Sequence, residues 1–258
     1  MSKAEVRGAI SLSIDLELAI GRQTSFGQQR LEEITAGLIE LLDQQGLCAT
    51  WGVSNPALSA ATEPILAANT RQEIAVLGER FWLGDGTPPT RLAQEFERRF
   101  EGARRAGIPI STLILRQNEE HLNLNLLLRH GVAAIRGPGI AASQEEANSR
   151  ALPMRYGIWQ VQNSILIPLR GAWWQAEPWA FGCRLKEAAK TGTPLHLVLD
   201  AGQMADHSDL ALPAIGVVLR RLGQLQARQE LSFSTVGEQA RLHLRRRIAQ
   251  PSRSVLAA

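Results

Sequence analysis

The sequence predicts an α/β fold in which parallel strands form a barrel. Short β-rich runs alternate with longer stretches of helical periodicity along the 258 residues, which is typical of right-handed strand–helix–strand units around a parallel sheet. The predicted strands are almost continuously apolar, as expected of parallel strands covered on both faces. Seven or eight such units in a chain of this length favour a barrel over an open sheet, and no glycine-rich phosphate loop follows any strand.

Eight runs have the composition of strands. The first is β-branched and ends abruptly at Asp15, and Pro168 places the sixth at an edge or at a strand end, because proline donates no ladder hydrogen bond. By residue number the runs are 9–14, 48–53, 73–77, 111–115, 132–135, 164–169, 195–199 and 231–233.

Helical periodicity fills the intervals between these strands. It predicts helices over 28–45, 90–106, about 118–130, 178–190 and 209–227, and a closing basic helix from about residue 236. Gly46 is expected to end the first helix, Asn118 to cap the third and Pro178 to begin the fourth. Thr235 and Glu238 have the spacing of a capping box for the last helix.

Charge and composition exclude several classes of protein. The net charge of the chain is +3. Five arginines and no acidic residue follow Ala240, so the rest of the chain is slightly negative. We therefore expect one domain over residues 1–258 with a basic C-terminal helix and tail, about 236–258, and no nucleic-acid-binding body. No run is long and apolar enough for a membrane span, and the N-terminus lacks a signal-peptide core, so we expect a cytoplasmic protein.

Cys48 and Cys183 are too few for a disulfide framework or a cysteine zinc site, and we expect both thiols to be buried.

Polar residues follow the predicted strands, and in parallel α/β folds the carboxyl ends of the strands form the active site. Asp15 and Glu17 stand two residues apart, so in an extended chain their carboxylates point the same way and either form an acid–base pair or recruit a cation. Arg116 ends an apolar strand and requires an anion, either Asp15 or an acidic ligand. The other strand-end candidates are Ser54, Asn55, Glu79, Arg80, Gln117, Asn118, Arg136, Arg170 and Asp200.

The histidines argue against a metal site. No two of the five lie three to five residues apart, so no pair is placed to share a metal ion. His196 alternates into a strand interior and is expected to be a hydrogen-bonded core group. Trp173 is a candidate stacking surface for a sugar.

The order of these motifs resembles the polysaccharide deacetylase superfamily, also called the NodB-homology or carbohydrate esterase 4 fold. The resemblance runs over residues 9–240 and rests on SIDLE at the first strand end, LLDQQGLCATWGV, RQEIAVLGERF, LILRQN and PLHLVLDAG. It implies a single distorted (β/α)7-type barrel with parallel strands. It also implies catalytic roles for Asp15, at the position of the family's base, and for Arg116, at the position of its arginine.

The departures from the family pattern concern the metal. The two metal-binding histidines of the family fall on Leu77 and Phe81, which cannot ligate a metal and which we expect to fill the space of the former site. We therefore expect no bound metal and no other cofactor. Glu17, Glu79, Asn118, Asp200 and Trp173 are the expected substrate-binding residues.

Three functions are consistent with the sequence. The first is a deacetylase-like barrel that binds a glycan or another small molecule after losing metal-dependent hydrolysis. The second is a metal-independent or atypical hydrolase of C–N bonds, because some relatives of this fold are thought to act without metal. The third is a non-catalytic scaffold that docks through its basic C-terminal helix.

Overall fold

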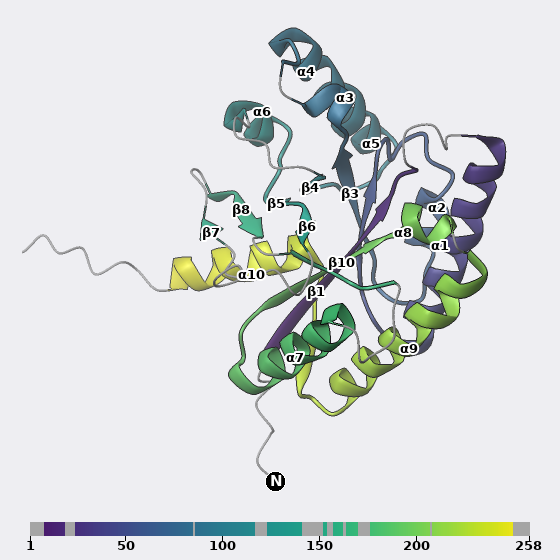
Figure 1. Cartoon of the computed structure of the whole chain (residues 1–258). Helices are drawn as coiled ribbons and strands as arrows, with labels where there is room; N and C mark the ends of the chain where they lie inside the picture. The colour runs from purple at the N-terminus through teal and green to yellow at the C-terminus, as the bar shows by residue number, and fades with distance from the viewer. Residues whose placement is uncertain are drawn as a thin grey trace, which may run out of the picture.

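The computed structural model describes most of the chain. The described residues are 8–18, 24–84, 86–116, 123–140, 152–153, 157–161, 164–169, 176–206 and 208–249. Within them, a strongly twisted sheet forms the centre and helices cover its outer face (Figure 1). No helix of this described part is both long enough and apolar enough to cross a membrane.

The described strands form one sheet in the order β6-β9-β10-β1-β2-β3-β4-β5-β8-β7, with β11 paired to β1. Every pairing is parallel except that of β7 with β8. The strands are β1 Gly8–Leu16, β2 Thr50–Val53, β3 Glu73–Gly78, β4 Thr112–Leu115, β5 Ala134–Arg136, β6 Gly139–Ile140, β7 Leu152–Pro153, β8 Trp159–Val161, β9 Ser164–Leu166, β10 Leu195–Asp200 and β11 Leu231–Phe233.

Helices follow β1, β2, β3, β4, β9 and β10 and connect each to the next strand, and the last helix, α10, follows β11. They are α1 Ser25–Gln45, α2 Thr62–Leu66, α3 Arg80–Leu83, α4 Pro89–Phe96, the π-helical turn η1 Glu97–Glu101, α5 Gly102–Arg105, α6 Leu124–Arg129, α7 Ala176–Thr191, α8 Ala201–Ala205, α9 Ser208–Ala227 and α10 Val236–Ala249. Gly46 ends α1 in the left-handed conformation, with φ 64°, as predicted. Pro178 is the third residue of α7 and not its first, because the helix begins at Ala176.

The segment from β5 to β6 nearly closes the sheet into a barrel. β5 lies beside β4 on one side of the sheet, and only two residues later β6 lies beside β9 on the other side. Gly139 makes this crossing possible, because a β-carbon there would stand 2.9 Å from the side chain of Leu166. The predicted α/β barrel of parallel strands is confirmed.

The two faces of the strands have different chemistry. On β1, Ile10, Leu12 and Ile14 point outward into the main hydrophobic core, whereas Ser11 and Ser13 point into the barrel, where both hydroxyls contact the ring of His196 at 2.6 and 3.0 Å. The expected core role of His196 is confirmed. Burial, reinforced by the nearby Arg136 charge, holds the pKa of His196 well below its usual value, so the ring is neutral.

The N-terminus of α10 closes the lower end of the barrel, opposite the carboxyl ends of the strands. The carboxylate of Glu73 accepts hydrogen bonds from the hydroxyls of Thr50 and Thr112, at 2.8 and 2.6 Å, and from the Gly237 N–H at 3.0 Å. The predicted capping box is present: Thr235 N–H donates to Glu238 at 3.1 Å, and Glu238 N–H donates to the Thr235 hydroxyl at 3.3 Å. A carboxylate at this helix N-terminus is favourably placed in the field of the helix dipole.

Candidate functional site

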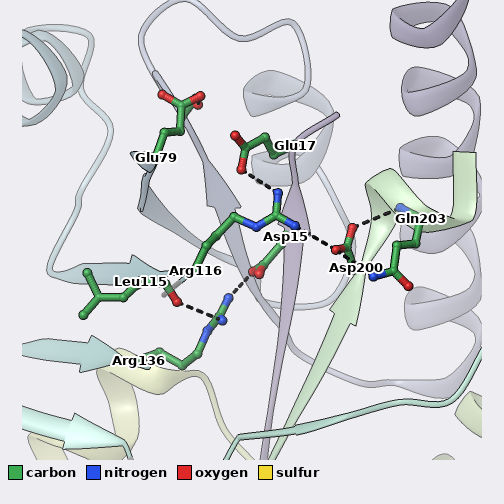
Figure 2. A network of polar contacts seen from close by, with 9 residues as sticks. Asp15, Glu17, Glu79, Leu115, Arg116, Arg136, Asp200 and Gln203 are labelled. Atoms are coloured by element: carbon green, nitrogen blue, oxygen red, sulfur yellow. Dashed lines mark hydrogen bonds and ion pairs between the residues drawn. The ribbon is translucent and has the colours of Figure 1, made fainter. Parts of the chain in front are cut away.

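The carboxyl ends of β1, β3, β4 and β10 meet at the upper end of the barrel, which we call the mouth. Five of the residues expected from the sequence lie there together: Asp15, Glu17, Glu79, Arg116 and Asp200 (Figure 2). The register explains the convergence, because Asp15 of β1 stands beside Asp200 of β10 and beside Gly52 of β2. Glu17 follows Asp15 on the same side of the strand.

Arg116 bridges two carboxylates at the mouth. Its Nη1 donates to Glu17 Oε2 at 2.6 Å and its Nη2 to Asp200 Oδ2 at 2.9 Å. Burial would lower the pKa of Arg116, but the two carboxylates outweigh that effect and raise it. Burial also raises the pKa of Glu17 and of Asp200, and Arg116 opposes part of that rise. Arg116 therefore stabilises the charged form of both acids.

Local structure fixes the position of Asp200. Its side chain caps α8 by accepting from the Gln203 backbone N–H at 3.0 Å, as expected at a strand-to-helix turn. Gly202 allows this turn to approach β1, because a β-carbon at Gly202 would overlap the carbonyl oxygen of Glu17. The close approach brings Asp200 and Glu17 within reach of the same guanidinium.

Asp15 has a different partner from the one that the sequence suggested. The expected alternatives for Arg116 were Asp15 or a ligand, but the guanidinium that binds Asp15 belongs to Arg136. Arg136 was expected at the rim, whereas its side chain is 1% exposed and also donates to the Gly137 carbonyl at 3.1 Å. In the register of the sheet Arg136 stands beside Ile114, one layer below Arg116, and it therefore reaches Asp15 from inside the barrel.

Glu79 is held by Ser54, which was among the expected strand-end residues, and by Arg99, which the sequence did not single out. It accepts from the Ser54 hydroxyl and from Arg99 Nη2, the latter at 3.1 Å. Arg99 comes from η1 and its guanidinium lies 4.7 Å from the ring of Trp82, in a cation–π contact. The signal for Arg99 was its spacing, because it stands three residues after Phe96 on the apolar stripe of the predicted helix.

A cavity of about 480 Å³ adjoins the carboxylates at the mouth. Its lining includes Glu17, Glu79, Ser54, Asn55 and residues at the N-terminus of α1. The side-chain oxygen of Asn55 is buried and accepts no hydrogen bond within the described structure. A buried acceptor without a partner is costly unless another group satisfies it.

The donor set at the mouth does not fit the divalent metal that the resemblance implies. Leu77, at the position of one family histidine, is fully buried and packs with Ala75 and Ile114 inside the barrel. Asp15, Glu17, Glu79 and Asp200 are each bonded to an arginine. Among the described residues, no three histidine, cysteine or acidic side chains are grouped so that they could hold a metal ion.

Some of the expected residues cannot be placed. Asn118, Trp173 and Arg170 lie outside the described residues, as does the side chain of Phe81. The expectation for the cysteines is wrong, because Cys48 is partly buried and Cys183 is exposed. Cys183 lies on the outward side of α7, where apolar neighbours in sequence do not imply burial.

Comparison with known proteins finds close similarity in fold but little similarity in sequence. No protein-family model matches the chain, and no curated protein matches it in sequence. A structure from Mycobacterium smegmatis described as a polysaccharide deacetylase superposes with a TM-score of 0.65 at 14% identity, over 97% of this chain and 95% of the other. The chain has the polysaccharide deacetylase fold. The resemblance seen in the sequence is thus confirmed at the level of fold.

Two further structures extend the comparison. A polysaccharide deacetylase homologue from Pseudomonas aeruginosa PAO1 gives a TM-score of 0.57 at 14% identity, over 93% of this chain and 91% of the other. PuuE allantoinase gives 0.56 at 15% identity, over 91% and 89%. Proteins of different described activity therefore share this deacetylase-type barrel, and the fold by itself does not decide the chemistry.

Proposed function

We propose that the mouth of this deacetylase-type barrel binds a neutral carbohydrate and does not carry out metal-dependent hydrolysis. The observation that carries the proposal is the pairing of every described carboxylate at the mouth with an arginine. A carboxylate bonded to a guanidinium is a poor base and a poor metal ligand, but its remaining lone pairs still accept hydrogen bonds.

The chemistry of the cavity suits hydroxyl groups. Glu17 and Glu79 offer acceptors, Ser54 offers a hydroxyl, and the buried oxygen of Asn55 lacks a partner that a sugar hydroxyl would supply. The volume of about 480 Å³ lies in the range of small-molecule sites, roughly 300–1,000 Å³. Since Arg116 neutralises only one of its two carboxylates, the mouth keeps a negative charge that disfavours acidic sugars.

The fold supports the same ligand class. The structures with which the chain superposes include two described as polysaccharide deacetylases, and the carboxylates at the strand ends of this barrel are groups suited to sugar recognition.

Calorimetric titration with N-acetylated chitooligosaccharides, which are uncharged, tests the proposal. We expect saturable binding, no release of acetate with or without added zinc or manganese, and a five- to ten-fold weaker affinity for Asn55→Ala, because a hydrogen bond is worth about 1 kcal/mol. Asn125→Ala, which alters an exposed asparagine on α6, is the matched control. Absence of binding at millimolar saccharide would refute the proposal.

A metal-independent hydrolase is the second candidate, because burial raises the pKa of Glu17 and Asp200. A carboxyl group with a raised pKa is suited to act as a general acid near neutral pH. This alternative requires acetate release in the presence of a chelator, and loss of that release in Asp200→Asn. The same titration samples distinguish the two candidates.

A further inference from the structure

A second cavity lies on the outside of the barrel, between α7 and α9, and shares no residue with the mouth. Its volume is about 840 Å³, and the two helices that form it are seen at the lower part of Figure 1. Along α7 its lining runs from Pro178 to Lys190, and along α9 from Val217 to Leu225, continuing into the turn at Arg228. We call this cavity the α7/α9 groove.

The groove is apolar at one end and cationic at the other. α7 and α9 each follow a strand of the same parallel sheet, so they run in the same direction and their early residues share one end. Trp179 and Val217 lie at that end, and their residues are 65% and 46% exposed. Lys190 and Arg228 lie at the opposite end.

Most cations of the groove have no acidic partner among the described residues. Lys186, Lys190 and Arg221 are exposed and make no ion pair with any other described residue. Arg228 stands 4.0 Å from Glu230, the limit of an ion pair, and its side chain is 62% exposed. The groove therefore has four cations and a single acid among its lining residues, with Lys190 and Arg228 at one end, and that end is complementary to an anionic group.

We propose that the α7/α9 groove binds one molecule of an anionic amphiphile, an acyl chain that carries a phosphate or carboxylate head group. The chain lies over Leu185 and Leu225 toward Trp179, and the head group lies between Lys190 and Arg228. From Trp179 to Lys190 the groove extends for about 16 Å at 1.5 Å per helical residue, which suits a medium-length acyl chain.

The concave shape selects a single amphiphile over a membrane surface. A peripheral membrane site presents its apolar side chains on a convex or flat face that enters the headgroup region. Here the apolar groups line a cavity that itself has the volume of a small-molecule site. Both sources offer the same anionic head group, so the test must separate monomeric amphiphile from vesicles.

Cys183 provides a direct probe, because it lines the groove and is exposed. Burial raises the pKa of the other thiol, Cys48, so Cys48 reacts slowly and serves as an internal reference. We expect monomeric decyl phosphate or decanoate, below micelle concentration, to slow maleimide alkylation of Cys183 at least five-fold without slowing that of Cys48. Lys190→Glu should reduce the apparent affinity at least ten-fold, while Arg105→Glu, a matched charge change on the exposed end of α5, should not.

Other outcomes overturn the proposal. Equal protection of Cys183 by uncharged decyl maltoside would show that the cations of the groove do not contribute to ligand binding. Protection by anionic phosphatidylglycerol vesicles but not by monomers would show a membrane surface. Unchanged affinity in both Lys190→Glu and Arg228→Glu, with native circular dichroism, would remove the head-group site. Saccharide binding at the mouth is measured separately, so either proposal can fail alone.

Discussion

Removal of Arg136 is expected to destabilise the barrel more than removal of any exposed arginine. Arg136 and Asp15 form an ion pair inside the barrel, with side chains that are 1% and 6% exposed. Arg136→Met leaves the Asp15 carboxylate buried without its charge partner. Breaking a buried pair from one side costs about 3–5 kcal/mol.

The loss is large enough to measure by thermal or urea unfolding. For a domain of this size, each kcal/mol shifts the midpoint of thermal unfolding by about 2–4 °C, so Arg136→Met should lower it by about 6–20 °C. Arg184→Met is the matched control, because it breaks the exposed Arg184–Glu187 pair on α7. That change should cost less than about 1 kcal/mol.

A double variant separates the charge from the packing. When Asp15→Ala is added to Arg136→Met, the uncompensated charge disappears, and the double variant should be more stable than Arg136→Met by at least about 1 kcal/mol. A single Arg136→Met variant within 1 kcal/mol of the parent, or a double variant whose losses simply add, would refute the reasoning.

Three further predictions concern residues inside the barrel and at its mouth. The lowered pKa of His196 means that the unfolded chain takes up a proton that the folded barrel excludes. The contribution of His196 to the free energy of unfolding is therefore full above about pH 6.5 and falls by up to about 1.4 kcal/mol per pH unit below it. In urea titrations between pH 7.5 and 5.5, the free energy of unfolding of His196→Gln should depend less steeply on pH than that of the parent, and an equal dependence contradicts the assignment. Leu77→His should cost about 2–4 kcal/mol in urea unfolding, whereas Leu77→Met should cost under about 1.5, and equal costs would show that Leu77 does not fill an apolar site. Gly202→Ala should cost about 1–3 kcal/mol because its β-carbon meets the Glu17 carbonyl, whereas Gly182→Ala in α7, where a β-carbon meets nothing, should stabilise by about 0.5–1 kcal/mol; thermal melts in which both variants behave alike would contradict the close approach.

The sequence predicted the long strands and their polar ends because those signals are local. The run from Leu195 to Leu199 is apolar except for His196 and then stops at Asp200. The run before Asp15 alternates apolar residues with two serines and likewise stops at an acid. β6, β7 and β8 were not predicted, because strands of two or three residues contain too little periodicity to be distinguished from loops. They are defined by long-range pairing: β6 pairs with β9, β8 with β5, and β7 with β8.

The partners at the mouth were harder to predict because they depend on how the sheet closes. Arg116 and Asp15 end strands that β2 and β3 separate, and no local pattern reveals which strand-end cation reaches Asp15. The near closure by the segment from β5 to β6 brings Arg136 across the barrel and assigns it to Asp15. Arg99 similarly reaches Glu79 from a helix outside the sheet.

Arg136 and Arg116 occupy two successive layers of the barrel interior, and Asp15 and Glu17 are separated in the same way along the chain at the end of β1. Arg136 stands beside Ile114 in the sheet, and Arg116 follows two residues after Ile114 on the same face, one layer higher. Asp15 and Glu17 are also two residues apart on one face. The lower acid therefore meets the lower arginine and the upper acid the upper arginine.

This layering bears on the chemistry that we propose for the mouth. Clustered carboxylates need nearby positive charge, and a guanidinium can supply it as a bound divalent cation does. Unlike that cation, a guanidinium, which stays protonated in proteins, neither polarises a carbonyl as a Lewis acid nor activates a water molecule. Substitution of Leu77 by histidine alone would leave the acids bonded to their arginines. Metal-dependent chemistry would require histidine ligands and release of at least one acid, which makes Arg116 the residue to replace alongside Leu77.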